Sequence, residues 1–284
     1  MQHLVLSNGV RMPILGFGVF QLPDQRQCQE VVAEALAIGY RLIDTAQAYG
    51  NEEAVGKAII ASGVPREQVF LTSKIWISHS GEKKAMASIE ESLKKLQTDY
   101  LDLMLIHQPF GDYYGTYRAL EKALAEGKCR AIGVSNFFAD RLVDLCNFVD
   151  VRPQVNQMET HVFQQQTALR PYLDKYKVQL EAWGPFAEGR NGFFTQPLLQ
   201  KIAEKRHKSV AQVGLRFLIQ SGIIAIPKSS HRERMEENID IFDFELTKAD
   251  MEQIRGLDLK RSLCCDHSDP EFVQALVELS KQQS

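Results

Sequence analysis

Cysteine is scarce in this chain, and its few copies are widely scattered. The sequence of 284 residues has five cysteines, of which only Cys264 and Cys265 are neighbours. This scatter excludes a disulfide framework, and an adjacent pair favours neither a relaxed disulfide nor a metal site. The seven histidines also lack metal-ligand spacing. We therefore expect no metal, and buried free thiols in a reducing cytoplasm.

A surplus of positive charge and a long uninterrupted apolar run are also missing. The formal net charge of −3 at pH 7 argues against broad nucleic-acid binding. The apolar runs near the start of the chain are interrupted by Ser7, Asn8, Gly9 and Arg11. Neither a signal peptide nor a membrane-spanning helix is therefore expected. These shortages predict a cytoplasmic protein with no nucleic-acid or membrane partner.

Eight short apolar runs alternate with amphipathic helical patterns along the chain. The runs are residues 14–19, 40–44, 69–76, 101–107, 129–136, 153–158, 178–183 and 223–229. Between them, residues 82–96 and 116–126 place apolar side chains on one helical face. Eight strand–helix units in about 250 residues predict an α/β fold, a closed (β/α)8 TIM barrel. Residues 1–284 are expected to form one barrel domain.

Turn signals near the N-terminus add a further element to this barrel. The Asn8-Gly9 pair between apolar residues predicts a β-hairpin, which we expect to close the bottom of the barrel. An open doubly wound sheet is the main alternative fold. Its dinucleotide fingerprint begins at Gly16-Phe17-Gly18, but Gln21 stands where the third glycine belongs, so this signal is weak.

Polar side chains occur where most of the apolar runs end. They are Asp44, Lys74, His107, Ser135, Asn136, Asn156, Gln157, Lys228 and Ser229. One such residue is usually only a turn residue or a helix cap. In a parallel barrel, however, all the carboxyl ends of the strands meet at one rim, which carries the active site of barrel enzymes. A rim with polar groups from most of its strands therefore favours a functional site.

Four side chains near this rim make a coherent proton-donating group. Lys74 lies in an apolar run and needs a partner, and Asp44 on the neighbouring strand is the obvious one. We expect the Lys74 cation to lower the pKa of Tyr49, which is ~10 when unperturbed, and so make it a general acid. His107 could orient a substrate carbonyl. Each residue alone has a structural explanation, but together they suit protonation of an oxygen that is becoming an alkoxide.

The helix that follows Tyr49 has its own start signal. Asn51 is expected to cap this helix, and Glu52 and Glu53 lie in its first turn, where negative charge suits the helix dipole. The cap would also hold Tyr49 in a short loop beside the barrel mouth.

Several long motifs occur along the chain in a fixed order. They are LIDTAQAYGNEEAVG, LTSKIW, LDLMLIHQP, AIGVSNF, PQVNQMETH, EAWGP and IPKSSHRERMEEN. Over essentially its whole length the sequence resembles the aldo-keto reductase family, in particular bacterial 2,5-diketo-D-gluconate and small-aldehyde reductases. The resemblance implies a (β/α)8 barrel closed at its bottom by a hairpin. It also implies that Asp44, Tyr49, Lys74 and His107 are the catalytic residues.

The resemblance further implies NADPH/NADP+ as the cofactor, bound across the rim without a Rossmann fold. Four residues match positions that contact the nicotinamide: Ser135, Asn136, Gln157 and Trp183. Five match the segment that holds the adenosine end: Lys228, Ser229, Arg234, Glu237 and Asn238. Without the resemblance, this last segment is better explained as a solvated charged helix.

Side chains near the strand ends are also candidates for the substrate pocket. They are Phe20, Trp76, Gln108 and Phe186. Gln108 stands where many aldo-keto reductases have Trp, which makes one wall more polar. Apolar walls with a few polar groups suit a small carbonyl compound.

The leading hypothesis is therefore a monomeric, NADPH-dependent reductase of small aldehydes, α-dicarbonyls or keto sugars. Two alternatives stay open. A barrel aldolase could use Lys74 as a Schiff-base nucleophile, although pairing with Asp44 would keep its amine charged. A non-catalytic NADP(H)-binding scaffold or sensor is also compatible with the fold, because one barrel supports many functions.

Overall fold

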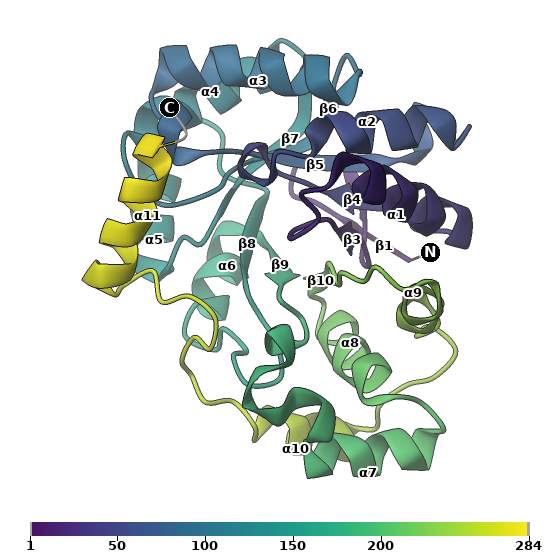
Figure 1. Ribbon diagram of the computed structural model, residues 1–284. Helices are drawn as coiled ribbons and strands as arrows, with labels where there is room; N and C mark the ends of the chain where they lie inside the picture. The colour runs from purple at the N-terminus through teal and green to yellow at the C-terminus, as the bar shows by residue number, and fades with distance from the viewer. Residues whose placement is uncertain (1, 283–284) are drawn as a thin grey trace.

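Eight parallel strands form a sheet that closes on itself in the computed structural model, which describes residues 2–282. They are β3 (Phe17–Gly18), β4 (Leu42–Asp44), β5 (Phe70–Ile75), β6 (Leu101–Ile106), β7 (Cys129–Ser135), β8 (Val155–Glu159), β9 (Gln179–Trp183) and β10 (Ile224–Ala225). The strands lie in the sheet in their order along the chain. A parallel bridge between Leu15 and Ala225 joins the two edges, so the sheet is a (β/α)8 barrel (Figure 1).

The two closing strands are much shorter than the apolar runs that predicted them. The runs span residues 14–19 and 223–229, whereas β3 and β10 have only two residues each. Single backbone hydrogen bonds replace a regular ladder here, as in Gly16 N–H to the Ala225 carbonyl at 2.8 Å and Gly18 N–H to the Pro227 carbonyl at 3.0 Å. The barrel therefore closes over a short seam.

Helices follow the strands and surround the barrel (Figure 1). They are α1 (Gln25–Ile38), α2 (Glu52–Ala61), α3 (Glu82–Leu96), α4 (Tyr113–Ala125), α5 (Ala139–Phe148), α6 (Arg170–Tyr176), α7 (Pro197–Arg206), α8 (Val210–Gln220), α9 (Arg232–Ile239), α10 (Lys248–Arg255) and α11 (Pro270–Gln282). Short 3-10 turns are η1 (Gln47–Tyr49), η2 (Arg66–Gln68), η3 (Ile77–His79) and η4 (Ala187–Thr195). Helix α3 has the predicted bounds, whereas α4 begins before residue 116 because Asp112 caps it by accepting from Gly115 N–H.

The predicted hairpin is present and lies at the bottom of the barrel. Strands β1 (His3–Val5) and β2 (Arg11–Pro13) pair antiparallel. Gly9 in the turn has a φ of 86°, a conformation that glycine adopts without a steric penalty. Asn8 Nδ2 donates to the carbonyl oxygen of Arg130 at 3.0 Å. Because Arg130 lies at the amino end of β7, this bond holds the hairpin against the face opposite the strand carboxyl ends.

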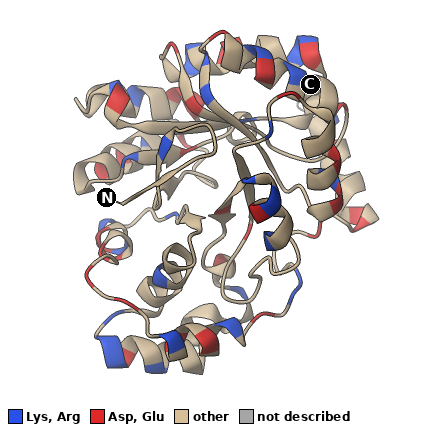
Figure 2. Ribbon diagram, turned by 180° about the vertical axis from the view of Figure 1, so that it is seen from behind, with Lys and Arg blue, Asp and Glu red and all other residues tan. Residues whose placement is uncertain are grey.

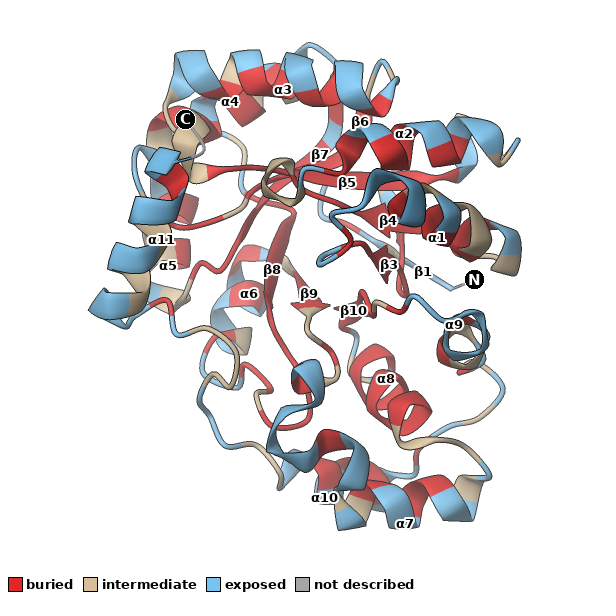
Figure 3. Ribbon diagram, viewed as in Figure 1, coloured by how far each residue is buried: buried red, intermediate tan, exposed pale blue. Residues whose placement is uncertain are grey.

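Burial follows the layers of the barrel. The strands and the inner faces of the helices are buried, while the outer helical faces are exposed (Figure 3). Helix α8 is the exception: it is buried on nearly all sides because η4, α7 and α9 pack around it. Lys and Arg alternate with Asp and Glu along the outer helices (Figure 2).

All five cysteines are free, but they are not equally buried. Three are buried as expected: Cys28, Cys129 and Cys146. Cys264 and Cys265 are only partly buried, so the expectation of a buried thiol was wrong for this pair. They lie in the segment between α10 and α11, which crosses the rim of the barrel rather than its interior.

Among residues 2–282, no helix has both the length and the apolar character needed to cross a bilayer.

Helices α2 and α3 approach each other closely at Gly56. A Cβ atom at this position would lie 2.6 Å from the carbonyl oxygen of Leu96 and 2.7 Å from its carbonyl carbon. Both are backbone atoms, so one of the two helices would have to move to admit a methyl group.

We predict that Gly56→Ala destabilises the protein by about 1–3 kcal/mol through this overpacking. Helix propensity alone predicts the opposite sign, since alanine favours a helix over glycine by about 1 kcal/mol. Urea unfolding would measure the change. Lys57→Ala, on the exposed side of the same helix, is the control and should shift stability by about 0.5 kcal/mol or less. A Gly56→Ala protein as stable as the parent would contradict the close approach.

Candidate active site

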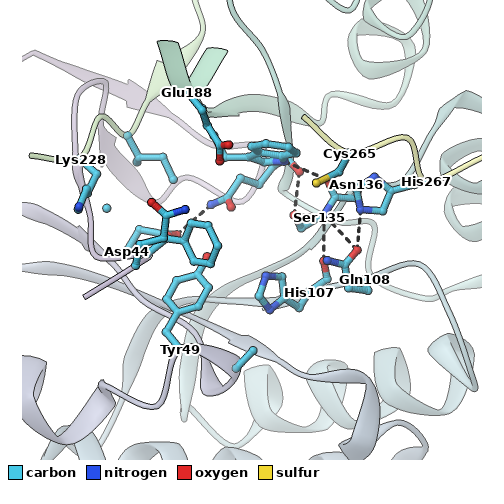
Figure 4. Close-up of a pocket in the computed structure, with 18 of the residues that line it drawn as sticks. Asp44, Tyr49, His107, Gln108, Ser135, Asn136, Glu188, Lys228, Cys265 and His267 are labelled. Atoms are coloured by element: carbon cyan, nitrogen blue, oxygen red, sulfur yellow. Dashed lines mark hydrogen bonds between the residues drawn. The ribbon is translucent and has the colours of Figure 1, made fainter. Parts of the chain in front are cut away.

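A cavity of about 600 Å³ opens where the carboxyl ends of the strands meet (Figure 4). Its walls come from strand ends and from the segment after α10, which contributes Cys265, His267 and Phe272. The volume is within the range of small-molecule sites. All four predicted pocket residues line it: Phe20, Trp76, Gln108 and Phe186. The rim that the strand-end residues predicted is therefore a real hollow in the molecule.

Lys74 lies at the centre of the polar group in this cavity. Its Nζ is 2.5 Å from Asp44 Oδ1, 2.9 Å from the Thr45 carbonyl oxygen and 3.3 Å from Tyr49 Oη. Lys74 and Asp44 are almost fully buried, on the neighbouring strands β5 and β4. The expected ion pair is therefore present, and Lys74 joins it to the Tyr49 phenol.

The electrostatics of Lys74 decide which chemistry it can perform. Burial is the largest single effect and lowers its pKa, but the charge and hydrogen bond of Asp44, together with smaller contributions from Tyr49 and Glu181, exceed it, so the pKa lies above its usual value. The amine thus remains protonated at neutral pH. A Schiff-base nucleophile must be a neutral amine, so this environment argues against the aldolase alternative.

Tyr49 differs in one respect from what the sequence predicts. Burial raises the pKa of its phenol, and this effect exceeds the lowering by the Lys74 charge, while Asp44 raises the pKa further. The expected net lowering was therefore wrong, because removing a phenolate from water is opposed more strongly than one nearby cation favours it. The phenol keeps its proton at neutral pH, as a proton donor must.

His107 faces Tyr49 in the cavity, with the two ring centroids 5.6 Å apart. Burial holds the pKa of His107 well below its usual range, and the charge of Lys74 acts in the same direction. The imidazole is therefore neutral. Its Nδ1 is buried and finds no hydrogen-bond partner in the described chain, which leaves Nε2 as the nitrogen available to a ligand in the cavity.

Asn51 holds the Tyr49 loop by contacts other than the predicted cap. Its side chain makes no capping hydrogen bond to α2, and its ψ of 10° is not the extended geometry of a capping residue. Instead, Oδ1 accepts from Thr45 Oγ1 at 2.7 Å. Nδ2 donates to the carbonyl oxygens of Val19 and Leu22 at 3.0 and 3.2 Å. The capping prediction was wrong, because these carbonyls and the Thr45 hydroxyl occupy the whole amide.

The residues assigned to the nicotinamide by resemblance lie together on one side of the cavity. Trp183 Nε1 donates to Asn136 Oδ1 at 2.9 Å, and Asn136 Nδ2 donates to the His107 carbonyl oxygen at 3.1 Å. Ser135 Oγ donates to the Gln157 carbonyl oxygen at 2.9 Å. Amide, hydroxyl and indole groups of this kind fit a flat carboxamide-bearing ring, and all four residues line the cavity.

The segment assigned to the adenosine end provides unpaired positive charge. Lys228 lines the cavity and Arg234 is exposed on α9, and neither forms an ion pair within residues 2–282. The neighbouring Arg232, by contrast, is paired with Glu34 and Glu236. Cations that form no ion pair within residues 2–282, one of them in the cavity wall, fit a phosphate-bearing ligand.

The other three residues of this segment already have contacts in the protein. Glu237 accepts a short hydrogen bond from Ser209 Oγ, at the start of α8. Ser229 Oγ accepts from His231 N–H at 3.1 Å, within its own turn. Asn238 is buried. A ligand at these three side chains would therefore meet groups that are held in place by the fold.

Glu181 is a buried acid beneath the site, and the motif reasoning assigned it no role. Gln157 Nε2 bridges Asp44 Oδ2 at 2.9 Å and Glu181 Oε2 at 3.0 Å. Burial, with the nearby Asp44 charge, raises the pKa of Glu181 to about 8. The signal was present in the sequence, since an acid interrupts the apolar run 178–183 at an inward-facing strand position.

His267 and Gln47 were also missed by sequence reasoning. Gln47 Oε1 accepts from Trp76 N–H at 3.0 Å and so supports a pocket wall. His267 Nε2 lies 2.7 Å from Gln108 Oε1. Neither residue ends a strand or belongs to a polar pattern, so no local signal could have identified them.

Glu159, His161 and Cys264 have possible metal ligand atoms within 4.8 Å of one another. His161 Nδ1 accepts from Phe163 N–H at 3.2 Å, so the imidazole hydrogen is on Nε2, 3.0 Å from Glu159 Oε1. A metal at Nε2 would move this hydrogen to Nδ1, against the Phe163 N–H. The group is therefore a hydrogen-bonded anchor.

Comparison with known proteins places this site in a family. The profile described as the aldo/keto reductase family matches residues 14–259, which include all eight barrel strands. The glyoxal reductase of Bacillus subtilis (strain 168) is 49% identical over 253 residues, which cover 89% of this chain and 91% of that protein.

Solved structures agree with the sequence comparison. An aldo/keto reductase from Brucella melitensis has a TM-score of 0.87 at 44% identity, covering 90% of this chain and 99% of that one. The Bombyx mori aldo-keto reductase, solved in complex with NADP, has a TM-score of 0.87 at 34% identity, covering 92% of this chain and 94% of that one.

Replacing Lys74 should expose the energetic role of the buried pair. Lys74→Met leaves the Asp44 carboxylate buried without its cation, and we predict a loss of about 3–5 kcal/mol of stability. Lys57→Met is the control, because Lys57 forms an exposed pair with Glu53, and it should lose about 1 kcal/mol or less. Denaturant unfolding of both variants measures the difference. Equal losses of stability in Lys74→Met and Lys57→Met would show that Lys74 does not stabilise the buried Asp44 carboxylate.

The pKa of Glu181 predicts a pH dependence of stability. Between its ordinary value of 4.5 and about 8, the folded protein holds a proton that the unfolded chain releases. The free energy of unfolding should therefore fall as pH rises through this window. Glu181→Gln should flatten that slope, whereas Glu233→Gln on exposed α9 should not. Urea midpoints measured from pH 5 to pH 8 test this, and parallel profiles for the parent and Glu181→Gln would refute it.

Proposed function

The chain belongs to the aldo/keto reductase family of NADP(H)-dependent oxidoreductases, and from this premise we propose that it reduces small aldehydes, α-dicarbonyls and keto sugars to alcohols. The observation that carries the proposal is the contact of one buried cation with both an acid and a phenol: Lys74 with Asp44 and Tyr49. This arrangement supplies a proton to an oxygen at the carboxyl end of the barrel, where the cavity lies.

NADPH supplies the hydride to the carbonyl carbon when it is bound. Tyr49 gives its proton to the carbonyl oxygen, as the general acid. Lys74 stabilises the negative charge that develops on the Tyr49 oxygen, and Asp44 keeps the ammonium in place. His107, being neutral, donates a hydrogen bond to the same carbonyl oxygen and orients it. Because Lys74 and Asp44 are buried, water screens their charges only weakly.

The proposed cofactor residues divide between the two ends of the dinucleotide. The nicotinamide end is assigned to Ser135, Asn136, Gln157 and Trp183. The adenosine end is assigned to Lys228, Ser229, Arg234, Glu237 and Asn238. Arg234 and Lys228 form no ion pair among the described residues, which supports a phosphate at this end, because a guanidinium fork pairs well with phosphate oxygens.

Small substrates are favoured by the walls of the cavity. Phe20, Trp76 and Phe186 provide apolar surface, and Gln108 provides one polar wall. The similarity to a glyoxal reductase supports α-dicarbonyls among the substrates. We further propose that the chain acts as a cytoplasmic monomer built as a single barrel domain.

Substitution of Tyr49 tests the proposal. Tyr49→Phe removes the proton donor and keeps the ring, so turnover of every aldehyde should fall by about 100-fold or more. NADPH binding, followed by fluorescence quenching, should change little. Consumption of NADPH absorbance with glyoxal, methylglyoxal, simple aldehydes and a keto sugar measures the activity, and Tyr172→Phe, at an exposed tyrosine, is the control.

Three outcomes would count against the proposal. A parent protein that turns over none of these carbonyl compounds would refute the reductase function, and tight NADPH binding without turnover would favour a scaffold or sensor. Near-normal turnover by Tyr49→Phe would refute its role as proton donor.

A further inference from the structure

A chain of hydrogen bonds determines how the Gln108 amide is oriented in the cavity wall. It begins at Asn136, whose amide lies between one group that can only donate a hydrogen bond and one that can only accept. Trp183 Nε1–H can only donate, and the His107 carbonyl oxygen can only accept. Asn136 therefore directs Oδ1 to Trp183 at 2.9 Å and Nδ2 to His107 at 3.1 Å, with no freedom to flip.

The next two contacts fix Gln108 in turn. The second hydrogen of Asn136 Nδ2 is shared between Ser135 Oγ at 3.1 Å and Gln108 Oε1 at 3.4 Å. His267 Nε2 lies 2.7 Å from the same Gln108 oxygen. Because an amide oxygen can only accept, the His267 nitrogen that faces it carries the hydrogen. Gln108 Oε1 is thus held by two donors, as the dashed lines in Figure 4 show.

The other end of the Gln108 amide is unused. Its NH2 group makes no hydrogen bond within residues 2–282, although Gln108 is only 8% exposed and lines the cavity beside His107. The NH2 group is therefore free to donate into the cavity, and a bound molecule with an oxygen at this point would supply the acceptor that the protein does not.

We propose that the Gln108 NH2 donates a hydrogen bond to an oxygen on the carbon next to the reactive carbonyl, and that His267 is a positioning residue that holds Gln108 for this contact. The inference rests on the proposed reductase function and narrows its substrate class. Tyr49 and His107 hold the oxygen that is reduced, and Gln108, the next residue along the chain, holds its neighbour. The preferred substrates are therefore α-dicarbonyls and α-hydroxycarbonyls.

His267 is well placed for this role because the segment before it is anchored and its own ring is packed. Glu159 Oε1 accepts from the N–H groups of Leu263 at 2.7 Å and Cys264 at 3.2 Å. The imidazole itself packs against three rings: Phe110, Phe138 and Phe272. Burial lowers the pKa of His267 to about 4, so it is a neutral donor at physiological pH.

Two aldehydes of similar size, with and without a second oxygen, separate recognition of that oxygen from general reductase activity. Methylglyoxal and 2-methylpropanal are similar in size, but only methylglyoxal has a second oxygen. Gln108→Met keeps the length of the side chain and should lower the ratio of kcat/KM for methylglyoxal over 2-methylpropanal about tenfold, mostly through KM. A single hydrogen-bond donor accounts for a change of this size.

His267 is tested in the same assay. His267→Phe keeps the ring contacts and removes the donor, so the ratio should fall about threefold. His267→Gln restores an N–H and should recover part of the loss. In the Gln108→Met background, His267→Phe should change the ratio no further, because its effect passes through Gln108. Nitrogen-15 spectra of histidine-labelled protein should show His267 as the Nε2–H tautomer, with a shift in Gln108→Met.

The outcomes distinguish this inference from the function on which it rests. If the parent protein reduces neither aldehyde, the proposed function fails and the inference fails with it. If the parent reduces both, but Gln108→Met leaves the ratio unchanged, only the inference is refuted. A His267→Phe protein that loses activity equally on both aldehydes would show a structural role for His267 and refute the positioning role.

Discussion

The contact between Lys74 and Asp44 is the interaction on which the rest of the site depends. A buried ammonium is tolerated in the mouth of the barrel only because a carboxylate lies 2.5 Å away. Their neighbouring strands are fixed by the ladder of the sheet, so the pair has little freedom to separate. The third contact of Lys74, to Tyr49, places the phenol at the edge of the cavity. The fold therefore determines where a proton can be delivered.

Burial favours the neutral form of the groups around this pair, so it raises the pKa of the acids and lowers the pKa of the histidine. It keeps Tyr49 and Glu181 protonated, and it keeps His107 neutral, while Lys74 remains charged because Asp44 is so close. A site with one strong ion pair surrounded by neutral groups avoids further unpaired buried charge. It can also supply both a proton and a neutral hydrogen-bond donor to one oxygen. Gln157 completes the arrangement by bridging the two acids without adding charge.

Local patterns predicted the barrel, its hairpin and the position of the site. Apolar runs of strand length and the Asn8-Gly9 turn are encoded by neighbours in sequence, and the need of Lys74 for a partner follows from its apolar run. The incorrect predictions concern properties that depend on contacts between residues distant in sequence. The amide of Asn51 bonds carbonyls about 30 residues earlier, which no capping rule anticipates. The net pKa of Tyr49 depends on how completely the folded chain removes water, and sequence spacing does not determine that quantity.

His267 shows most clearly how reaction and specificity are divided in this molecule. The proposed proton donor and its partners come from adjacent strands, where the rigid sheet fixes distances. The contact that orients Gln108 comes from a residue 159 positions away, in a segment held to the rim by Glu159. Changes in that segment can alter what lies beside Gln108 without moving Lys74 or Asp44. A barrel organised in this way can keep one reaction while its C-terminal segment changes which neighbouring oxygen is recognised.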